Sequence, residues 1–230
     1  MTFSIAARCP DTGMVGVAVS TALLCVGQLC PFPRAGAGAI STQSFVNPYL
    51  GLRGLDLLAS GMDAAAVRDR LAADDEGRAI RQFSVVDTAG GSAAYTGVDC
   101  VPWCGHRTGD GFAVAGNMLT GEAVIGAMAA AFTASTGQPF GERLVQVLEA
   151  GQAAGGDKRG RQSAALKVMD HEEYPTIDIR VDDHPEPVTE LRRIWGLYNA
   201  GFGDVVRMMP TKANPVGSFD LEALRPFLPK

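Results

Sequence analysis

The stretch from residue 2 to residue 20 constrains the fold of this chain more than any other part of the sequence. Two short runs rich in apolar residues, 2–8 and 14–20, flank a turn at 9–13 that contains Pro, Asp and Gly. Such runs around such a turn are typical of a β-hairpin. Chain ends are commonly disordered, whereas here a strand pattern starts at once. We therefore expect the beginning of the chain to be held inside a sheet.

Thr2 gains chemical interest from this position. Its small side chain favours removal of the initiator Met1, after which Thr2 carries a hydroxyl and a free α-amino group. An α-amine has a reference pKa near ~8, so part of it is unprotonated at neutral pH and can take the hydroxyl proton, directly or through one water. Thr2 is therefore a candidate nucleophile that supplies its own base. The alternative is that Thr2 is only the start of the chain.

Length and composition indicate one principal domain. The chain has 230 residues, of which 47% are hydrophobic, and its composition shows no break. This is enough for one large core, and we expect the domain to span 1–198. The remaining segment, 199–230, contains four prolines and cannot form a long helix. We expect it to be a C-terminal extension that wraps over the body or helps to form a homo-oligomer.

The charge balance argues against nucleic acid as a partner. The formal net charge is -5, and the only basic run is the short segment 158–161, whereas nucleic-acid-binding domains carry basic patches. No apolar run reaches membrane-spanning length, and residues 2–8 read as a strand rather than as a signal peptide. We therefore expect a cytoplasmic protein with no membrane partner.

The cysteines indicate neither disulfides nor metal. They are five in number, at positions 9, 25, 30, 100 and 104. An odd number in a chain without an export signal favours reduced, buried thiols. A zinc site made of the last four and His106 is the alternative, but neither cysteine pair has the two-residue spacing of structural zinc motifs. We expect no metal and no cofactor.

Hydrophobic periodicity predicts further strands at 36–43, 80–86, 92–96, 111–116, 163–169 and 176–181. It predicts helices at 48–60, 64–73, 121–134, 140–153 and 185–198. The segments 21–34 and 101–110 read as loops. Strands and helix pairs thus alternate in groups, unlike the single alternation of parallel folds. This order predicts an α+β fold, a four-layer αββα sandwich with two antiparallel sheets between helix pairs.

An N-terminal Thr that opens a strand, followed by a hairpin and such a sandwich, resembles the N-terminal-nucleophile (Ntn) hydrolases, the superfamily of the proteasome β-subunits. More closely, several separated segments resemble the family catalogued as domain of unknown function 1028. These segments are Thr2–Ile5, Gly16–Ser20, Arg34–Ala39, Pro102–Gly109, Gly116–Leu119, Ala154–Ala164 and Arg180–Pro185. The resemblance covers about residues 2–198. It implies an Ntn-hydrolase-like fold with Thr2 at the nucleophile position, and it implies no particular substrate.

Two positions depart from the pattern of proteasome-type enzymes. Ser20 falls where those enzymes place an acidic residue, and Arg34 lies roughly where they place a lysine. Ser20 can hydrogen-bond the nucleophile or its amine but cannot hold a buried cation. Arg34 stays protonated and cannot accept a proton, although it can contact a substrate. The α-amine of Thr2 is then the only evident base.

Five further residues are candidates for the same site. Asn117, between a strand and a helix, can donate to the oxyanion of a tetrahedral intermediate, or it can be a left-handed turn residue. Thr42 and Gln43 close the third strand and can line a substrate pocket or only solvate a strand end. His106 can contact substrate or be structural. Asp157, in the polar loop with Lys158, Arg159, Arg161 and Gln162, can bind a carboxylate-bearing substrate or be a solvated loop residue.

The Asp-Asp-His run at 182–184 is better explained as the cap of the last predicted helix than as a metal site, because adjacent strand residues point to opposite faces. Taken together, the residues predict a hydrolase that cleaves an amide or related C–N bond in a small or peptide-like substrate, with Thr2 as nucleophile. The alternative is a non-catalytic assembly or binding protein that has the fold but lacks the charged residues around its nucleophile.

Overall fold

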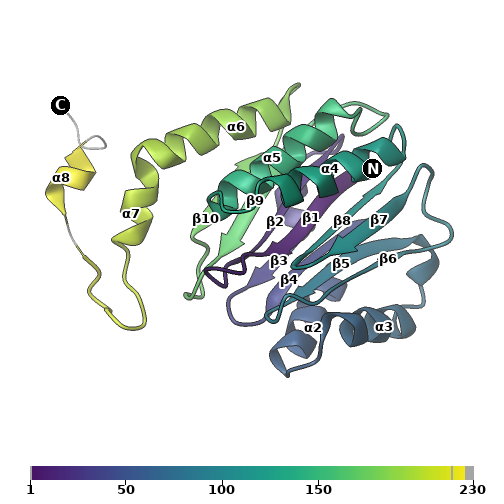
Figure 1. Ribbon diagram of the computed structural model, residues 1–230, viewed down its shortest axis with the longest axis horizontal. Coiled ribbons are helices and arrows are strands. Elements are labelled where there is room, and N and C mark those ends of the chain that lie inside the picture. Colours follow the sequence, from purple (N-terminus) through teal and green to yellow (C-terminus); the bar gives the residue numbers. More distant parts are fainter. Residues whose placement is uncertain (1, 219, 226–230) are drawn as a thin grey trace.

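Two antiparallel sheets pack face to face and carry helices on both outer surfaces (Figure 1). The structure, a computed structural model, describes residues 2–218 and 220–225. The larger sheet has the strand order β10-β9-β2-β1-β8-β7, and the smaller has the order β3-β4-β5-β6. This confirms the predicted α+β class with two antiparallel sheets and flanking helices.

The strands of the larger sheet are β1 (Thr2–Arg8), β2 (Val15–Thr21), β7 (Gly105–Gly109), β8 (Phe112–Asn117), β9 (Ser163–Met169) and β10 (Ile177–Val181). Those of the smaller sheet are β3 (Pro31–Arg34), β4 (Gly38–Ser44), β5 (Arg81–Asp87) and β6 (Ser92–Thr96). The longer helices are α2 (Pro48–Ala59), α3 (Ala64–Asp74), α4 (Glu122–Ala134), α5 (Phe140–Ala153) and α6 (Pro187–Leu197). Short helical segments are α1 (Val26–Leu29), a 3₁₀ turn (Arg78–Ile80), a π-helical turn (Tyr198–Phe202), α7 (Gly203–Arg207) and α8 (Leu221–Leu224).

β1 lies inside the larger sheet, between β2 and β8. Its first six residues are buried, and alternate side chains of a strand point to opposite faces. Phe3 and Ile5 belong to the apolar core beneath α4 and α5. Ser4, in contrast, hydrogen-bonds Gln43 of the facing sheet. Thr2 shares the face of Ser4 and therefore points into the layer between the two sheets.

The helices cover the two sheets unequally. α2 and α3 pack on the smaller sheet, as the predicted pair. α4 and α5 pack on the larger sheet, where a third helix, α6, covers β9 and β10 (Figure 1). Among the described residues, no helix has the length and apolar character to cross a membrane.

The segment 21–34, predicted to be a loop, contains the end of β2, the short helix α1 and the strand β3. β3 is an edge strand that pairs with β4. It reads Pro-Phe-Pro-Arg, and prolines are tolerated on an edge because a missing N–H there breaks no ladder. The prediction was wrong because the two prolines, typical of loops, outweighed the strand pattern.

The segment 101–110, also predicted to be a loop, contains the edge strand β7. Three of its five residues, His106, Arg107 and Thr108, are exposed. An edge strand with such a solvent-facing sequence lacks the apolar alternation by which strands are recognised. It is nevertheless held by pairing with β8 over its whole length.

The last long helix begins at Pro187, not at Pro185 as predicted. Both prolines suit a first helical turn, and the second of them occupies it. His184 lies just before the helix, and its Nδ1 accepts the backbone N–H of Glu186 at 3.0 Å. The prediction that the Asp-Asp-His run caps this helix was wrong: Glu186 occupies the N-cap position, and no side chain accepts an N–H of the first turn there.

After α6 the chain leaves the body, and the segment that contains α7 and α8 lies at one side of the molecule (Figure 1). The loop that follows α7 contacts the body through Tyr174, whose Oη donates to the Pro210 carbonyl at 2.8 Å. Lys212 pairs with Glu173 at 3.0 Å. The boundary at residue 198 and the role of the extension in oligomers stay predictions. Residues 219 and 226–230 of this extension lie outside the described residues.

The close packing of α2 on the smaller sheet gives a matched test of this fold. A Cβ added to Gly51 of α2 would lie 2.3 Å from the ring of Phe32 on β3. We expect Gly51→Ala to lower the free energy of unfolding by about 1–3 kcal/mol, because the helix or the ring must shift. A Cβ at Gly126 of α4 would meet only Arg107 Nη1, at 3.8 Å.

Gly126→Ala is therefore the control. It should raise the free energy of unfolding by about 0.5–1 kcal/mol, because alanine loses less backbone entropy in a helix. Urea denaturation of both variants measures the difference. Equal stability of the two variants would contradict the packing described for α2.

Candidate active site

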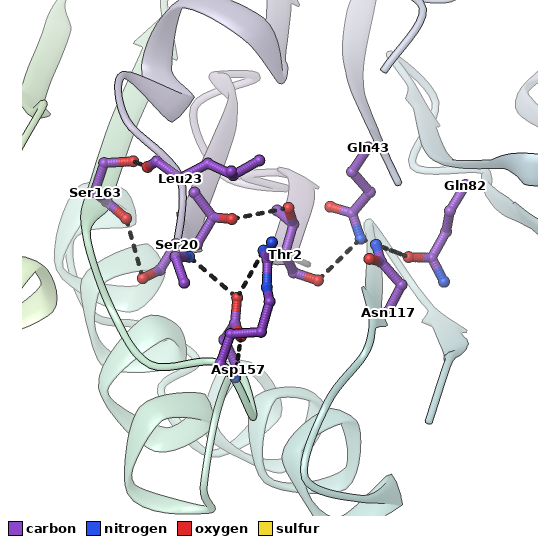
Figure 2. A network of polar contacts seen from close by, with 11 residues as sticks. Thr2, Ser20, Leu23, Gln43, Gln82, Asn117, Asp157 and Ser163 are labelled. Carbon is purple, nitrogen blue, oxygen red and sulfur yellow. Dashed lines mark hydrogen bonds and ion pairs between the residues drawn. The ribbon is translucent and has the colours of Figure 1, made fainter. Parts of the chain in front are cut away.

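Thr2 lies at the head of β1, buried between two neighbouring strands (Figure 2). It stands opposite Asn117, the last residue of β8. On the other side, the pairing of Phe3 with Ser20 brings Thr21, the next residue of β2, beside Thr2. The Thr2 hydroxyl donates to Thr21 Oγ1 at 3.3 Å. The nucleophile candidate is thus held between two strand ends of the same sheet.

The Ser20 side chain makes no hydrogen bond to Thr2. Its hydroxyl donates to the Ser163 carbonyl of β9 at 3.3 Å (Figure 2). In an antiparallel pair, residues that stand opposite each other share a face, so Ser20 shares the face of Phe3 under the helices. Thr21, which sequence reasoning missed, occupies the position beside Thr2. The strand register would have identified Thr21, but the register depends on how the hairpin turn pairs the two strands.

Three side-chain amides form a buried cluster beside Thr2 (Figure 2). Gln43 Nε2 lies 3.5 Å from the Thr2 carbonyl oxygen and donates to Gln82 Oε1 at 2.7 Å. Asn117 Nδ2 donates to the same Gln82 oxygen at 3.0 Å. Gln82 Nε2 in turn donates to the Gly116 carbonyl at 2.8 Å. Gln82, on β5 of the smaller sheet, thus joins the two amide residues that the sequence predicted, Gln43 and Asn117. Nothing in the sequence around Gln82 indicated this role.

The orientation of Gln43 is fixed by two serines. Ser4 Oγ donates to Gln43 Oε1 at 2.7 Å, and Ser41 Oγ donates to Ser4 Oγ at 2.9 Å. The Gln43 oxygen therefore accepts from Ser4 while its nitrogen faces Thr2 and Gln82.

Asn117 is an extended strand residue, not a left-handed turn residue. It is the last residue of β8, and the left-handed conformation belongs to the next residue, Met118, with φ 51°. The strand register with Thr2 and the amide contact with Gln82 account for its burial. The alternative explanation of Asn117 as a turn former is therefore wrong.

Asp157, labelled in Figure 2, connects the polar loop to Ala22, the residue that follows Thr21. Its side chain is 1% exposed. Oδ2 accepts the backbone N–H of Ala22 at 3.0 Å, and Oδ1 accepts that of Arg159 at 2.8 Å. The Arg159 guanidinium lies 3.4 Å from Oδ2. Asp157 is therefore not a solvated loop residue: it fixes the polar loop against the end of β2.

His106 connects to the amide cluster indirectly. Its Nδ1 lies 2.8 Å from Thr96 Oγ1, which also accepts from Gln82 Nε2 at 2.9 Å. The Thr96 hydroxyl hydrogen is then available to Nδ1. Although the side chain reaches solvent, desolvation of the ring, followed by the charge of Arg68, lowers the pKa of His106. A neutral ring that accepts from Thr96 fits this direction.

Arg34 and Thr42 lie away from Thr2. Arg34 pairs with Asp56 of α2 at 2.8 Å and stands opposite Gly38, at the other end of β4 from Gln43. Thr42 is buried, and its hydroxyl lies 3.4 Å from the Asn47 carbonyl. Because it neighbours Gln43 on a strand, it points to the opposite face.

The cysteines are all free thiols, and three of the five are buried. Cys30 is buried, and its carbonyl accepts the Thr42 backbone N–H at 3.2 Å. Burial raises the pKa of the Cys30 thiol to about 12. Within the ranges that the structure describes, no group of three or more His, Cys, Asp or Glu side chains is placed to hold a metal ion.

Comparisons with known proteins identify a family but no activity. A family model described as "Family of unknown function (DUF1028)" matches residues 2–191. The crystal structure of protein SPO2555 from Silicibacter pomeroyi, also described as DUF1028, is 32% identical, with a TM-score of 0.86 over 95% of this chain and 99% of that chain. Anbu, an ancestral β-subunit from Yersinia bercovieri, matches with 10% identity and a TM-score of 0.39 over 88% of this chain and 97% of that chain. No curated protein matches the sequence.

The amide cluster predicts a large effect of one substitution. Gln82→Leu removes the acceptor shared by the Asn117 and Gln43 amide nitrogens and a donor to the Gly116 carbonyl, all of them buried. Each unsatisfied buried group costs about 1–3 kcal/mol, so we expect a loss of at least ~2 kcal/mol in the free energy of unfolding. Gln138→Leu, at an exposed position, should change it by less than ~0.5 kcal/mol. Urea denaturation that ranks the two variants equally would contradict this account.

The burial of Cys30 predicts that its thiol is protected from alkylation in the native protein. Alkylation requires the thiolate, and the side chain is buried with its pKa raised to about 12. Iodoacetamide at pH 8 should therefore leave Cys30 unmodified in the native protein and modify it after unfolding in urea. Peptide mass mapping reads both states. Modification of Cys30 at the same rate in the two states would show that the thiol is accessible.

Proposed function

The chain belongs to the DUF1028 family, and we propose that it is an N-terminal-nucleophile hydrolase in which Thr2 cleaves an amide or related C–N bond of a small or peptide-like substrate. One observation carries this proposal. The Thr2 hydroxyl is buried at the head of a central strand, 3.3 Å from the Thr21 hydroxyl and opposite Asn117. A threonine that only begins the chain would not require a buried hydroxyl with these partners.

The α-amine of Thr2 is the proposed base, which requires prior removal of Met1. Within the described residues, the side chains that hydrogen-bond Thr2 are those of Thr21 and Gln43, and both are neutral. Neither Thr nor Gln takes a proton at neutral pH. The Thr21 hydroxyl accepts from Thr2 in the structure and orients its oxygen. The amine on the same residue then supplies the basicity that these neighbours lack.

The proposed reaction has two steps. The Thr2 oxygen attacks the carbonyl carbon, and its proton passes to the α-amine. The C–N bond then breaks, the leaving nitrogen takes that proton, and an acyl ester remains on Thr2. Water, deprotonated by the amine, hydrolyses the ester and restores the hydroxyl.

The oxyanion of each tetrahedral intermediate needs a preorganised donor. Asn117 Nδ2 carries two hydrogens, of which one is given to Gln82 Oε1 at 3.0 Å. We assign the other to the oxyanion, because Asn117 stands opposite Thr2. Gln82 fixes the plane of the Asn117 amide, so that the donor direction is set before substrate binds.

A second candidate function is a non-catalytic assembly or binding role. The observation that favours it is the absence of a charged side chain among the described hydrogen-bond partners of Thr2. Such surroundings leave the amine unsupported and the reaction slow. A homo-oligomer is compatible with both functions and stays a proposal.

The test is covalent labelling with a hydroxyl-directed β-lactone, followed by peptide mapping. We expect a protein that lacks Met1 and an adduct on Thr2, lost in Thr2→Ala. Since the amine must be unprotonated, the labelling rate should rise with pH up to about 8. Retention of Met1 in the purified protein, or an adduct on Ser20 or Cys25 with none on Thr2, would favour the non-catalytic role.

Two matched variants locate the contact that orients the nucleophile. Thr21→Val removes the hydroxyl that accepts from Thr2 and should slow labelling about tenfold, the loss of one oriented hydrogen bond of ~1–1.5 kcal/mol. Ser20→Ala removes a hydroxyl on the opposite face and should leave the labelling rate unchanged. A larger effect of Ser20→Ala than of Thr21→Val would overturn the geometry proposed for the site.

A further inference from the structure

A polar pocket of about 450 Å³ opens beside the end of β2. Its lining includes Ala22, Arg159, Arg161, Gln162, Asp183 and His184. These residues come from three segments: the end of β2, the polar loop before β9, and the turn before α6. We call it the arginine pocket.

The arginine pocket adjoins the proposed nucleophile. Ala22 in its wall directly follows Thr21, whose hydroxyl lies 3.3 Å from that of Thr2. Gln162, also in the wall, donates its backbone N–H to the Thr21 carbonyl at 2.9 Å. One residue, Thr21, thus separates the pocket wall from the reacting hydroxyl.

The lining is rich in hydrogen-bond donors. The side chains of Arg159 and Arg161 are 37% and 39% exposed, so that a ligand reaches both guanidinium groups from solvent. His184 accepts at Nδ1 from the Glu186 backbone, which leaves the proton of a neutral ring on Nε2 as a donor. Two guanidinium groups and an imidazole N–H match a carboxylate, which accepts at both oxygens.

The acidic groups around the pocket leave room for such a ligand. Both oxygens of Asp157 already accept backbone N–H groups. Glu186 pairs with Arg161, but both side chains are well exposed, and exposed ion pairs contribute little. Asp183 accepts from the Gln162 amide at 3.2 Å. A ligand carboxylate therefore competes with Glu186 for Arg161 and with Asp157, 3.4 Å away, for Arg159.

We propose that the arginine pocket binds a free carboxylate of the substrate, so that the substrate class is an amide whose carboxylate lies close to the scissile bond, such as an N-acyl amino acid or the end of a peptide. This inference rests on the proposed function for the identity of the scissile bond. The pocket itself comes from residues that the nucleophile proposal does not use. Its carboxylate selectivity is therefore measurable without turnover.

The experiment measures binding to the Thr2→Ala variant, which cannot form an acyl ester. The probes are N-acetylated glycine, leucine and glutamate and their C-terminal amides, titrated by NMR or calorimetry. We expect at least one acid to bind at least tenfold more tightly than its amide. Arg161→Gln and Arg159→Gln should each weaken binding of that acid at least fivefold, whereas Arg193→Gln, on the exposed face of α6, should leave it unchanged.

The comparison of acid with amide needs no pocket variant and stays valid if an arginine variant fails to fold. If no acid binds better than its amide, or if Arg193→Gln weakens binding as much as Arg161→Gln, the proposal is wrong. Acid-selective binding without labelling of Thr2 would keep the pocket and end the hydrolase proposal. Labelling of Thr2 without acid-selective binding would support the hydrolase proposal and end the proposal for the arginine pocket.

Discussion

The pairing of β1 with its two neighbours is the constraint on which the site depends. Backbone hydrogen bonds set Thr2 opposite Asn117 on β8 and Phe3 opposite Ser20 on β2. A slip of one residue in either pairing would turn the polar site residues toward the helices and Phe3 toward the facing sheet. Burial of Phe3 and its apolar neighbours under α4 and α5 opposes that slip. The hydrophobic face of β1 therefore holds the polar face in register.

The layer between the two sheets changes character along its length. Further along β1 it is filled by small apolar side chains such as Ala6, Ala39 and Val86. At the Thr2 end it holds amides instead, and burying an amide is costly unless its donors and acceptors are paired. Gln82 meets this condition by accepting from Gln43 and Asn117 and donating to Gly116. The sheets are thus joined by hydrogen bonds where the proposed chemistry takes place.

Sequence patterns predicted the buried strands and amphipathic helices because periodic burial leaves a periodic sequence. They missed β3 and β7, edge strands whose residues are proline-rich or solvent-facing. At the site they named Thr2, Asn117 and Gln43, which the fold brings together. The sequence did not predict that Thr21, and not Ser20, contacts Thr2, because that contact depends on the register of the hairpin. It did not predict that Gln82 joins Gln43 and Asn117, because that contact depends on how the two sheets stack.

Asp157 contributes to the site by fixing the backbone beside it. Its oxygens accept the backbone N–H groups of Ala22 and Arg159, so its charge stabilises the junction between the end of β2 and the polar loop. Thr21 directly precedes Ala22, and the contact that holds the wall of the arginine pocket therefore also positions the hydroxyl beside Thr2. In the proposed mechanism, Asp157 fixes the backbone at the end of β2, and the α-amine of Thr2 supplies the basicity.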